Sequence, residues 1–234
     1  MHAIAGADPE GCPLPLPHPP TAVLLDLDGT LIDSAPAILA ALTAAFTELG
    51  LPAQTPAQLK RFVGPPLVDG FRLYAGLTGA ANTRAVATYR HHYRQTMLDS
   101  PLYDGVNELV HDLHTAGVPL ALATSKHEGY AREILRHHGL LDRFTVVSGA
   151  GDGDIGGRKA QVIGSALDRL AAAGVDVSRP VHVGDLAHDV EGARAAGVDC
   201  IGVLWGYGSP EALHGAVALA ATPADLQKLL GEEV

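Results

Sequence analysis

Two aspartates, two positions apart, are the residues best placed to do chemistry in this 234-residue chain. Asp26 and Asp28 follow the apolar run 22–25, which is short and β-branched enough to be a buried parallel strand. Two carboxylates at the end of such a strand are costly unless a cation meets them there. Gly29 then turns the chain, and the Thr30 hydroxyl can bond back to the backbone. Because ligands bind beyond the carboxyl ends of parallel strands, this segment predicts the floor of an active site.

Three further predicted strands, over 119–123, 144–147 and 181–183, also lead into polar residues. The groups that follow them are a hydroxyl, an ammonium and two carboxylates: Thr124, Lys159, Asp185 and Asp189. Parallel strand ends open on one edge of a sheet, so these groups can face a single point. Phosphoryl transfer needs an in-line nucleophile, which an aspartate can supply, together with cations and an orienting donor. The set therefore predicts phosphoryl transfer, with Mg²⁺ held by Asp26 and Asp185.

The elements that must position these groups alternate between strand and helix, which predicts an α/β fold with a doubly wound parallel sheet. Five strands are expected, the first over 22–27 and the last over 200–204. Residues 35–100 break this alternation, because they read as four helices with no strand among them.

We therefore expect a catalytic core made of residues 21–34 and 101–234, with residues 35–100 inserted as a helical cap. An insertion directly after the first strand lies over the aspartate pair, where a mobile lid can exclude water. Residues 1–20 carry six prolines and no basic segment before an apolar run, so they predict a flexible leader and not a secretory signal.

The composition excludes several classes of function. A hydrophobic content of 47% with 18% charged residues is typical of a globular chain. A formal net charge of −10 disfavours nucleic acid and anionic membranes as partners. No apolar run approaches the ~18 residues that a membrane span needs. Cys12 and Cys200 lie far apart without metal-type spacing, which favours a reducing cytoplasm.

Taken together, the motifs resemble the haloacid dehalogenase superfamily, and within it the phosphoglycolate-phosphatase-like branch with a helical cap. The resemblance rests on DLDGT at 26–30, TSK at 124–126, Lys159 and GDLAHD at 184–189. The segments FVGPPL at 62–67 and GVLWGYG at 202–208 are similar to that branch too, and the resemblance covers about residues 21–231.

The resemblance implies roles for the acidic residues. Asp26 matches the nucleophile that becomes phosphorylated, and Asp28 matches the acid/base that protonates the leaving alcohol and then activates water. The Mg²⁺ ligands implied are the Asp26 and Asp185 carboxylates and the backbone carbonyl of Asp28. Asp189 matches a carboxylate that orients the metal waters or binds the metal.

The resemblance also implies a phosphate site. Thr124, the Ser125 backbone and Gly29 match phosphate-binding positions, and Lys159 matches the lysine that neutralises nucleophile and phosphate. The sequence leaves open whether the neighbouring Arg158, or Lys126 of the TSK motif, shares this role. Arg61 in the cap can reach a substrate, although a residue of this kind is more often solvated.

The function expected is a Mg²⁺-dependent phosphatase that hydrolyses a small phosphorylated metabolite, phosphoglycolate by resemblance. A 5′-nucleotide is the alternative substrate, and a phosphomutase of the β-phosphoglucomutase type is the alternative reaction. A metal-free dehalogenase is disfavoured, because its reaction needs no acid at the position of Asp28. A non-catalytic protein on this scaffold is disfavoured as well, because it would be expected to have lost one of the candidate catalytic groups, and none is missing. A cytoplasmic monomer or homodimer is expected.

Overall fold

The structure is a computed structural model, and it describes residues 16–152 and 155–231. Its centre is a six-stranded parallel sheet with the order β3-β2-β1-β4-β5-β6. The strands are β1 (Ala22–Leu25), β2 (Leu120–His127), β3 (Val146–Ala150), β4 (Pro180–Gly184), β5 (Asp199–Val203) and β6 (Ala218–Ala220). The predicted fold class is confirmed by this sheet and its flanking helices.

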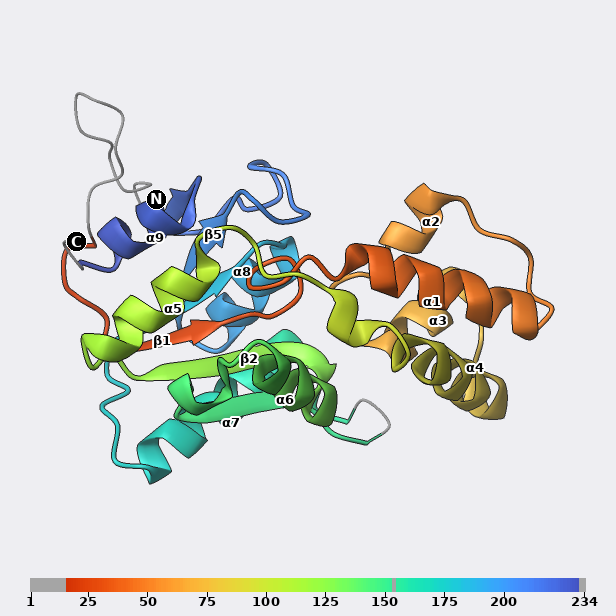
Figure 1. The fold of residues 1–234 in the computed structure, drawn as a ribbon, viewed down its shortest axis with the longest axis horizontal. Coiled ribbons are helices and arrows are strands. Elements are labelled where there is room, and N and C mark those ends of the chain that lie inside the picture. The colour runs from red at the N-terminus through yellow and green to blue at the C-terminus, as the bar shows by residue number, and fades with distance from the viewer. Residues whose placement is uncertain (1–15, 153–154, 232–234) are drawn as a thin grey trace.

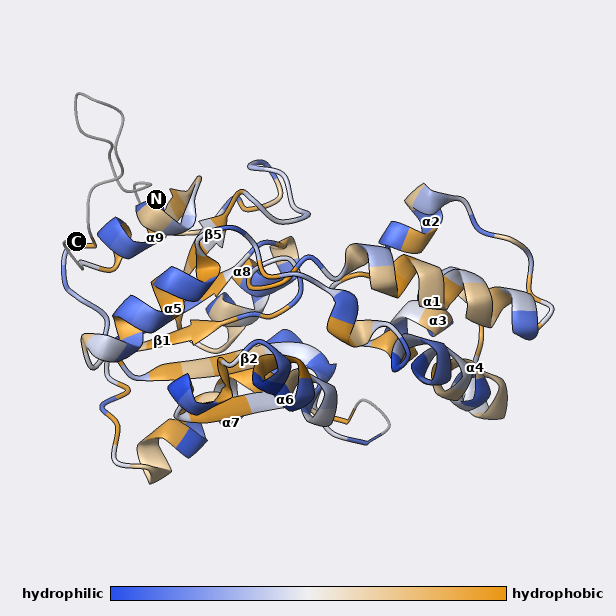
Figure 2. Cartoon of the chain, viewed as in Figure 1, coloured by the Kyte–Doolittle hydropathy of each residue, from blue (hydrophilic) through white to orange (hydrophobic). Residues whose placement is uncertain are grey.

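Helices cover both faces of the sheet (Figure 1). One face packs against α5 (Val106–Thr115), α6 (Glu128–His137) and α9 (Pro223–Leu229); the other packs against α7 (Lys159–Ala172) and α8 (Ala187–Ala195). In β1, Val23 and Leu25 face the first layer, whereas Ala22 and Leu24 face the second. This burial on both sides explains why β1 is apolar along its length in Figure 2, while α5 is polar on its outer side.

Three expectations about the strands differ from the structure: their number, the end of the second and the end of the first. The sheet has a sixth strand, β6, which is only three residues long and too short to give a periodic signal. The second strand continues beyond residue 123 to His127, so it carries the TSK motif, which lies where the pairing with β3 shifts register between Ala123 and His127. The first strand ends at Leu25, and the aspartate pair lies in the turn that follows it.

Residues 35–100 contain helices and no strand, as expected. They form α1 (Ala35–Glu48), α2 (Pro56–Lys60), α3 (Leu67–Ala75), α4 (Gly79–Tyr93) and a short 3₁₀ turn over Met97–Asp99. A second 3₁₀ turn, Leu141–Arg143, belongs to the core. Figure 1 shows the four helices as a body of their own beyond the carboxyl ends of the strands. We call residues 35–100 the helical unit; its role as a cap stays a prediction.

The helical unit has its own aromatic centre. The Phe46 ring lies 5.9 Å from both the Phe62 and Phe71 rings, measured between centroids, and Phe62 and Phe71 are 5.3 Å apart. Thr55 caps α2: its side chain accepts from the Gln58 backbone N–H, and the Gln58 side chain accepts from the Thr55 backbone N–H. Local capping and aromatic packing thus both contribute to the stability of the helical unit.

The termini bear on two further expectations. Most of the predicted leader, residues 1–20, lies outside the described residues, as does Cys12. The part that is described is held to the surface, because the Leu16 backbone N–H donates to the Leu229 carbonyl at 2.9 Å. Cys200 is buried in β5. Among the described residues, no helix is long and apolar enough to cross a membrane.

Candidate active site

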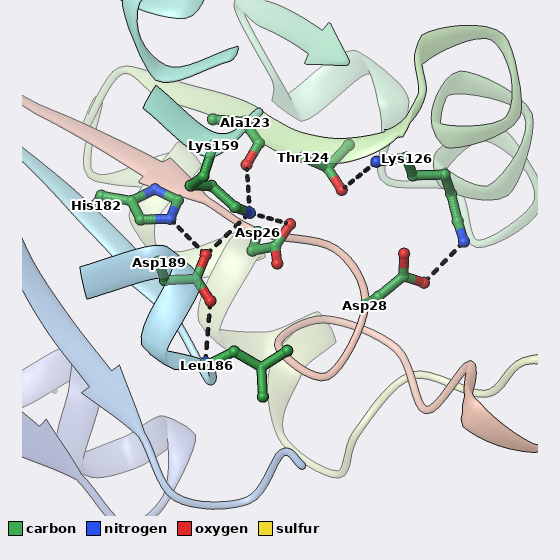
Figure 3. A network of polar contacts seen from close by, with 9 residues as sticks. All are labelled: Asp26, Asp28, Ala123, Thr124, Lys126, Lys159, His182, Leu186 and Asp189. Carbon is green, nitrogen blue, oxygen red and sulfur yellow. Dashed lines mark hydrogen bonds and ion pairs between the residues drawn. The ribbon is translucent and has the colours of Figure 1, made fainter. Parts of the chain in front are cut away.

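The carboxyl edge of the sheet brings together the polar residues expected there (Figure 3). Apart from Asp26 and Asp28, which share one turn, each comes from a different segment. Asp26 and Asp28 lie in the turn after β1, Thr124 lies within β2, Lys159 begins α7, and Asp189 lies in the first turn of α8. Asp185 directly follows β4. The parallel order of β2, β1 and β4 places these segments side by side, as the sequence predicts.

Lys159 holds the centre of this cluster. Its Nζ lies 2.8 Å from Asp26 Oδ1 and 2.9 Å from Asp189 Oδ1, and it donates to the Ala123 carbonyl at 3.2 Å. Its side chain is only 5% exposed. An ammonium group has three N–H donors, so all of its donors have acceptors from the protein. The approach of Lys159 to Asp26, which the sequence predicts, is present in the structure.

Asp189 is held from several sides. Its Oδ1 also accepts from His182 Nε2 at 2.9 Å, and its Oδ2 accepts from the Leu186 backbone N–H at 3.0 Å. Burial by itself raises the pKa of Asp189, but Lys159 and His182 outweigh it and hold the pKa below its ordinary value. Both oxygens are therefore engaged by protein donors, and the carboxylate is kept charged.

The pKa values of Lys159 and Asp26 show the opposing effects of burial and charge. Burial lowers the pKa of Lys159, but the Asp189 and Asp26 carboxylates outweigh it and raise that pKa above its ordinary value. Burial raises the pKa of Asp26, Lys159 opposes this, and Asp189 adds to it, so that the pKa is raised overall. The positive charge of Lys159 therefore does not fully offset the effects of burial and of Asp189 on the pKa of Asp26.

Asp185 shows the clearest need for a further cation. It is fully buried, and its Oδ2 accepts from the Tyr207 backbone N–H at 2.7 Å. Its Oδ1 is buried and has no hydrogen-bond partner among the described residues. Burial, and then the nearby Asp189 and Asp26 carboxylates, raise the pKa of Asp185 to about 8. A Cβ on Gly29 (φ +81) would clash with this carboxylate, so the close approach requires glycine.

These features fit a divalent cation. Carboxylate oxygens of Asp26, Asp185 and Asp189 all lie within 4.8 Å of one another. All are hard oxygen donors, which is the ligand type that Mg²⁺ prefers. The unpartnered Asp185 Oδ1 supplies an independent sign, because a buried carboxylate oxygen without a donor is costly unless a cation meets it.

Asp28 belongs to a second cluster. Lys126 Nζ lies 2.8 Å from Asp28 Oδ1 and donates to the Tyr93 hydroxyl at 2.8 Å. The same ammonium lies 4.5 Å from the centre of the Tyr93 ring. Tyr93 is the last residue of α4, so this cluster joins the core to the helical unit. Lys126 thus faces Asp28, and its contacts do not include Asp26.

Two other cations considered from the sequence lie away from Asp26. The Arg158 side chain is 72% exposed, and its Nε lies 3.8 Å from Asp69 in α3. The Arg61 guanidinium stacks on the Tyr74 ring at 4.2 Å and is not among the residues that line the pocket described next. The structure therefore does not bring either of them to Asp26, and their proposed substrate contacts stay unsupported.

A pocket of about 70 Å³ lies between the core and the helical unit. Asp26, Asp28, Thr124, Ser125 and Lys126 line it from the core. From the helical unit it is lined by apolar and aromatic residues and by one cation, among them Phe62, Tyr89, Arg90 and Tyr93. Thr124 is buried and accepts a hydrogen bond from the Lys126 backbone N–H at 3.3 Å. The nucleophile candidate and the acid/base candidate thus open into one confined space.

Three residues with a structural part in the site were not singled out from the sequence. His182 is fully buried on β4 and contacts Asp189. The sequence feature that could have identified it is a histidine within an otherwise apolar strand. The Tyr207 hydroxyl donates to Asp33 Oδ1 at 3.0 Å and accepts from the Ala35 backbone N–H at 2.9 Å, where the helical unit begins. Trp205 Nε1 donates to the Thr30 carbonyl at 2.9 Å.

Comparisons with known proteins agree with this geometry. Residues 23–203 match the family model described as haloacid dehalogenase-like hydrolase. Tyrosine-protein kinase PtkA of Mycobacterium tuberculosis is 40% identical over 218 residues, covering 91% of this chain and 73% of the relative. The solved structure of PtkA is similar with a TM-score of 0.75 at 39% identity, covering 92% of this chain and 100% of that chain.

Two other relatives are named for phosphate-ester hydrolysis. A 5′-nucleotidase of Pseudomonas aeruginosa is 36% identical over 193 residues, covering 82% of this chain and 86% of the relative. A phosphoglycolate phosphatase of Xanthomonas campestris pv. campestris is 38% identical over 196 residues, covering 80% of this chain and 85% of the relative. The two names match the two substrates that the sequence left open.

Proposed function

The chain belongs to the haloacid dehalogenase-like hydrolase family and is a phosphatase, and on that premise we propose that it hydrolyses small phosphomonoesters with Mg²⁺ through phosphorylated Asp26. The observation that carries this proposal is the buried cluster in which Lys159 contacts both Asp26 and Asp189 beside Asp185. Such a cluster gathers a nucleophile, a fixed cation and a second cation site at one point, as phosphoryl transfer requires.

Asp26 and Asp185 would hold Mg²⁺, together with the backbone carbonyl of Asp28. When bound, the ion supplies positive charge that draws the phosphoryl oxygens toward the carboxylate nucleophile. Asp189 suits a different part, because Lys159, His182 and the Leu186 N–H already engage both of its oxygens. We assign it to fixing Lys159 and the metal waters.

The reaction has two halves. In the first, the Asp26 carboxylate attacks phosphorus, the bond to the leaving oxygen breaks, and Asp28 gives its proton to that oxygen. In the second, Asp28 takes a proton from water, the water oxygen attacks the phosphorus of phospho-Asp26, and phosphate leaves with Asp26 restored. The Thr124 hydroxyl and the Ser125 backbone N–H line the pocket and would donate to the phosphoryl oxygens.

The helical unit acts as the cap in this proposal, with residues 35–100 closing over the core segments 21–34 and 101–234. It supplies the aromatic half of the pocket, including Tyr89 and Tyr93. A closed cap keeps water out while phosphoryl transfer occurs, and it selects the leaving group. We propose that a small metabolite, by similarity phosphoglycolate, is the substrate of a cytoplasmic monomer or homodimer.

The main alternative substrate is a 5′-nucleotide, which the similarity to the Pseudomonas aeruginosa 5′-nucleotidase supports. The pocket of about 70 Å³ favours the smaller ester, because a nucleoside would need the cap to open much further. A phosphomutase of the β-phosphoglucomutase type uses the same catalytic groups but returns the phosphoryl group to the substrate. The similarity to PtkA adds transfer from ATP to a tyrosine as an activity to test.

One panel of substrates separates these activities. The protein is assayed with Mg²⁺ for phosphate release from phosphoglycolate, nucleoside monophosphates, hexose phosphates and phosphotyrosine. Isomerised hexose phosphate without phosphate release would identify a mutase, and labelling of a tyrosine peptide from radioactive ATP would identify a kinase. Mg²⁺-dependent phosphate release, lost in Asp26→Asn, is the expected result. Hydrolysis that persists in the presence of EDTA or in that variant would contradict the proposed mechanism.

A further inference from the structure

We propose that Tyr207 is a positioning residue that links the metal site to the helical unit, so that a cation bound at Asp185 orders the segment by which the unit leaves the core. This inference rests on the proposed Mg²⁺ site and adds a residue that does not itself hold the ion. Tyr207 lies in the loop after β5, and its two ends contact different parts of the molecule. Its backbone N–H donates to Asp185, and its hydroxyl contacts Asp33 and Ala35.

The hydroxyl of Tyr207 caps the first helix of the helical unit. The first N–H groups of a helix have no partner within it. Ser34, the N-cap residue of α1, makes no capping hydrogen bond through its side chain to any of the described residues. The Ala35 N–H donates instead to the Tyr207 hydroxyl at 2.9 Å, and this hydroxyl donates to Asp33 Oδ1 at 3.0 Å. A residue of the core thus supplies the cap that α2 obtains locally from Thr55.

The contact with α1 bears on both segments that join the two bodies. Figure 1 shows the chain passing between the core and the helical unit in two segments. These segments are bonded to each other, because the Asp33 N–H donates to the Pro101 carbonyl at 2.9 Å and the Tyr103 N–H donates to the Leu31 carbonyl at 3.0 Å. A residue that orders the first segment at Asp33 therefore orders the second segment as well, and with them the placement of the helical unit.

The backbone of Tyr207 has little room to move apart from Asp185. Its N–H donates to Asp185 Oδ2 at 2.7 Å. A Cβ on Gly206 would overlap the Gly29 carbonyl and the Asp185 side chain, and a Cβ on Gly208 would overlap the Asp185 carbonyl. The loop thus packs against the turns after β1 and β4 at a distance that only glycine allows. A shift of the Asp185 carboxylate therefore moves the backbone of residue 207 with it.

The ring of Tyr207 carries such a shift to the helical unit. The ring is rigid, and only two side-chain torsions set the position of its hydroxyl relative to the backbone. A cation that meets the buried, unpartnered Oδ1 of Asp185 fixes this carboxylate, and with it the Tyr207 N–H and the hydroxyl that caps Ala35. Because coupling between two sites is reciprocal, an ordered linking segment also favours binding of the cation.

The test measures hydrogen exchange at both ends of Tyr207 by NMR. Exchange of the Tyr207 N–H reports the contact with Asp185, and exchange of the Ala35 N–H reports the contact with the hydroxyl. In the unmodified protein, Mg²⁺ should slow both by about fivefold or more, the lower end of the usual coupling between two sites. In Tyr207→Phe, Mg²⁺ should slow exchange only at residue 207, because the variant keeps the backbone N–H and loses the hydroxyl.

Tyr74→Phe is the matched control, because it removes a hydroxyl from α3, outside both linking segments. It should behave as the unmodified protein does. For the ester hydrolysed best, kcat/KM at saturating Mg²⁺ should fall by about fivefold or more in Tyr207→Phe and stay unchanged in the control, since the helical unit is held less firmly over the core. Asp33→Asn is a milder second variant that keeps the shape of the hydroxyl's acceptor and removes its charge.

Three results would overturn this inference alone: Mg²⁺ slows exchange at Tyr207 but not at Ala35 in the unmodified protein, Mg²⁺ still slows exchange at Ala35 in folded Tyr207→Phe, or kcat/KM is unchanged in that variant. If Tyr207→Phe does not fold, Asp33→Asn decides the question. It should reduce the effect of Mg²⁺ on Ala35 by a smaller factor, and an unreduced effect would refute the link. Mg²⁺ that slows exchange at neither N–H of the unmodified protein would instead contradict the proposed metal site.

Discussion

The site contains two buried lysines that face the two aspartates of one turn, and they are held in different ways. Lys159 meets Asp26, Asp189 and the Ala123 carbonyl, all of which belong to the core. Lys126 meets Asp28 from the core and Tyr93 from the helical unit. The Lys159 cluster lies entirely within the core, whereas the Lys126 cluster joins the core to the helical unit.

This difference separates two tasks. The Lys159 cluster fixes charge around the nucleophile, and its donors are all used before a substrate arrives. The Lys126 cluster includes Asp28, and its geometry depends on the position of Tyr93 in α4. The core can therefore keep the same chemistry while the helical unit changes which esters are accepted.

The largest effect is expected at the nucleophile of the first cluster. Asp26→Asn should reduce phosphate release to background, because an amide cannot form the phosphorylated intermediate. The fold should persist, since Lys159 keeps Asp189 and the Ala123 carbonyl as partners. Phosphate release and a thermal unfolding curve are measured on the same preparation. Turnover close to that of the unmodified protein would disprove the role of Asp26.

The next largest effect is expected on the free energy of unfolding, when each of the two lysines is replaced. Lys159→Met should lower the free energy of unfolding by about 3–5 kcal/mol, because it leaves two buried carboxylates without their cation. Lys126→Met should cost less, since it leaves one carboxylate whose side chain is 15% exposed. Urea unfolding of both variants measures the difference. Equal losses would show that the two clusters do not differ in the way described.

Metal binding should depend on pH through Asp185. The folded-state pKa of about 8 lies above the ordinary 3.8, so without a cation this group lowers stability as pH rises between these values. Mg²⁺ requires the charged carboxylate, and its binding removes that cost. Mg²⁺ should therefore raise the melting temperature more at about pH 9 than at about pH 6.

Asp185→Asn is the matched control for this prediction, because it keeps the shape and removes the titrating group. Its melting temperature should respond little to Mg²⁺ at either pH. EDTA should stop hydrolysis by the unmodified protein, and added Mg²⁺ should restore it. A Mg²⁺ effect that is the same at both pH values would contradict the role of Asp185.

The smallest effect is expected at His182, which contacts Asp189 of the Lys159 cluster. His182→Leu removes one donor from Asp189, which keeps Lys159 and the Leu186 N–H. The loss should be about 2 kcal/mol of unfolding free energy, in the range for a hydrogen bond to a charged group. Urea unfolding measures it beside Lys159→Met. A loss as large as that of Lys159→Met would mean that His182 holds the cluster to the same extent.

Much of the core could be predicted from the sequence, because parallel strands bring their carboxyl ends to one edge. The segments DLDGT, TSK and GDLAHD therefore indicated that Asp26, Thr124 and Asp185 meet. The assigned chemical roles follow from that meeting and stay predictions until the assays above are made.

The contacts between the two bodies could not be predicted in the same way. The contact of Lys126 with Tyr93 depends on how the helical unit is placed, and no periodicity in the sequence encodes this. Arg61 illustrates the same limit, since stacking on Tyr74 within the unit keeps it from the pocket. The strand β6 was missed because three residues carry too little pattern.

The chain contains one tryptophan, and its place gives the protein a built-in optical signal. The indole N–H of Trp205 is bonded to the carbonyl of Thr30, directly after the turn that carries both aspartates. Any rearrangement of that turn alters the surroundings of the only indole fluorophore. Binding of a cation or an ester can thus be followed in the unlabelled protein, before any product is formed.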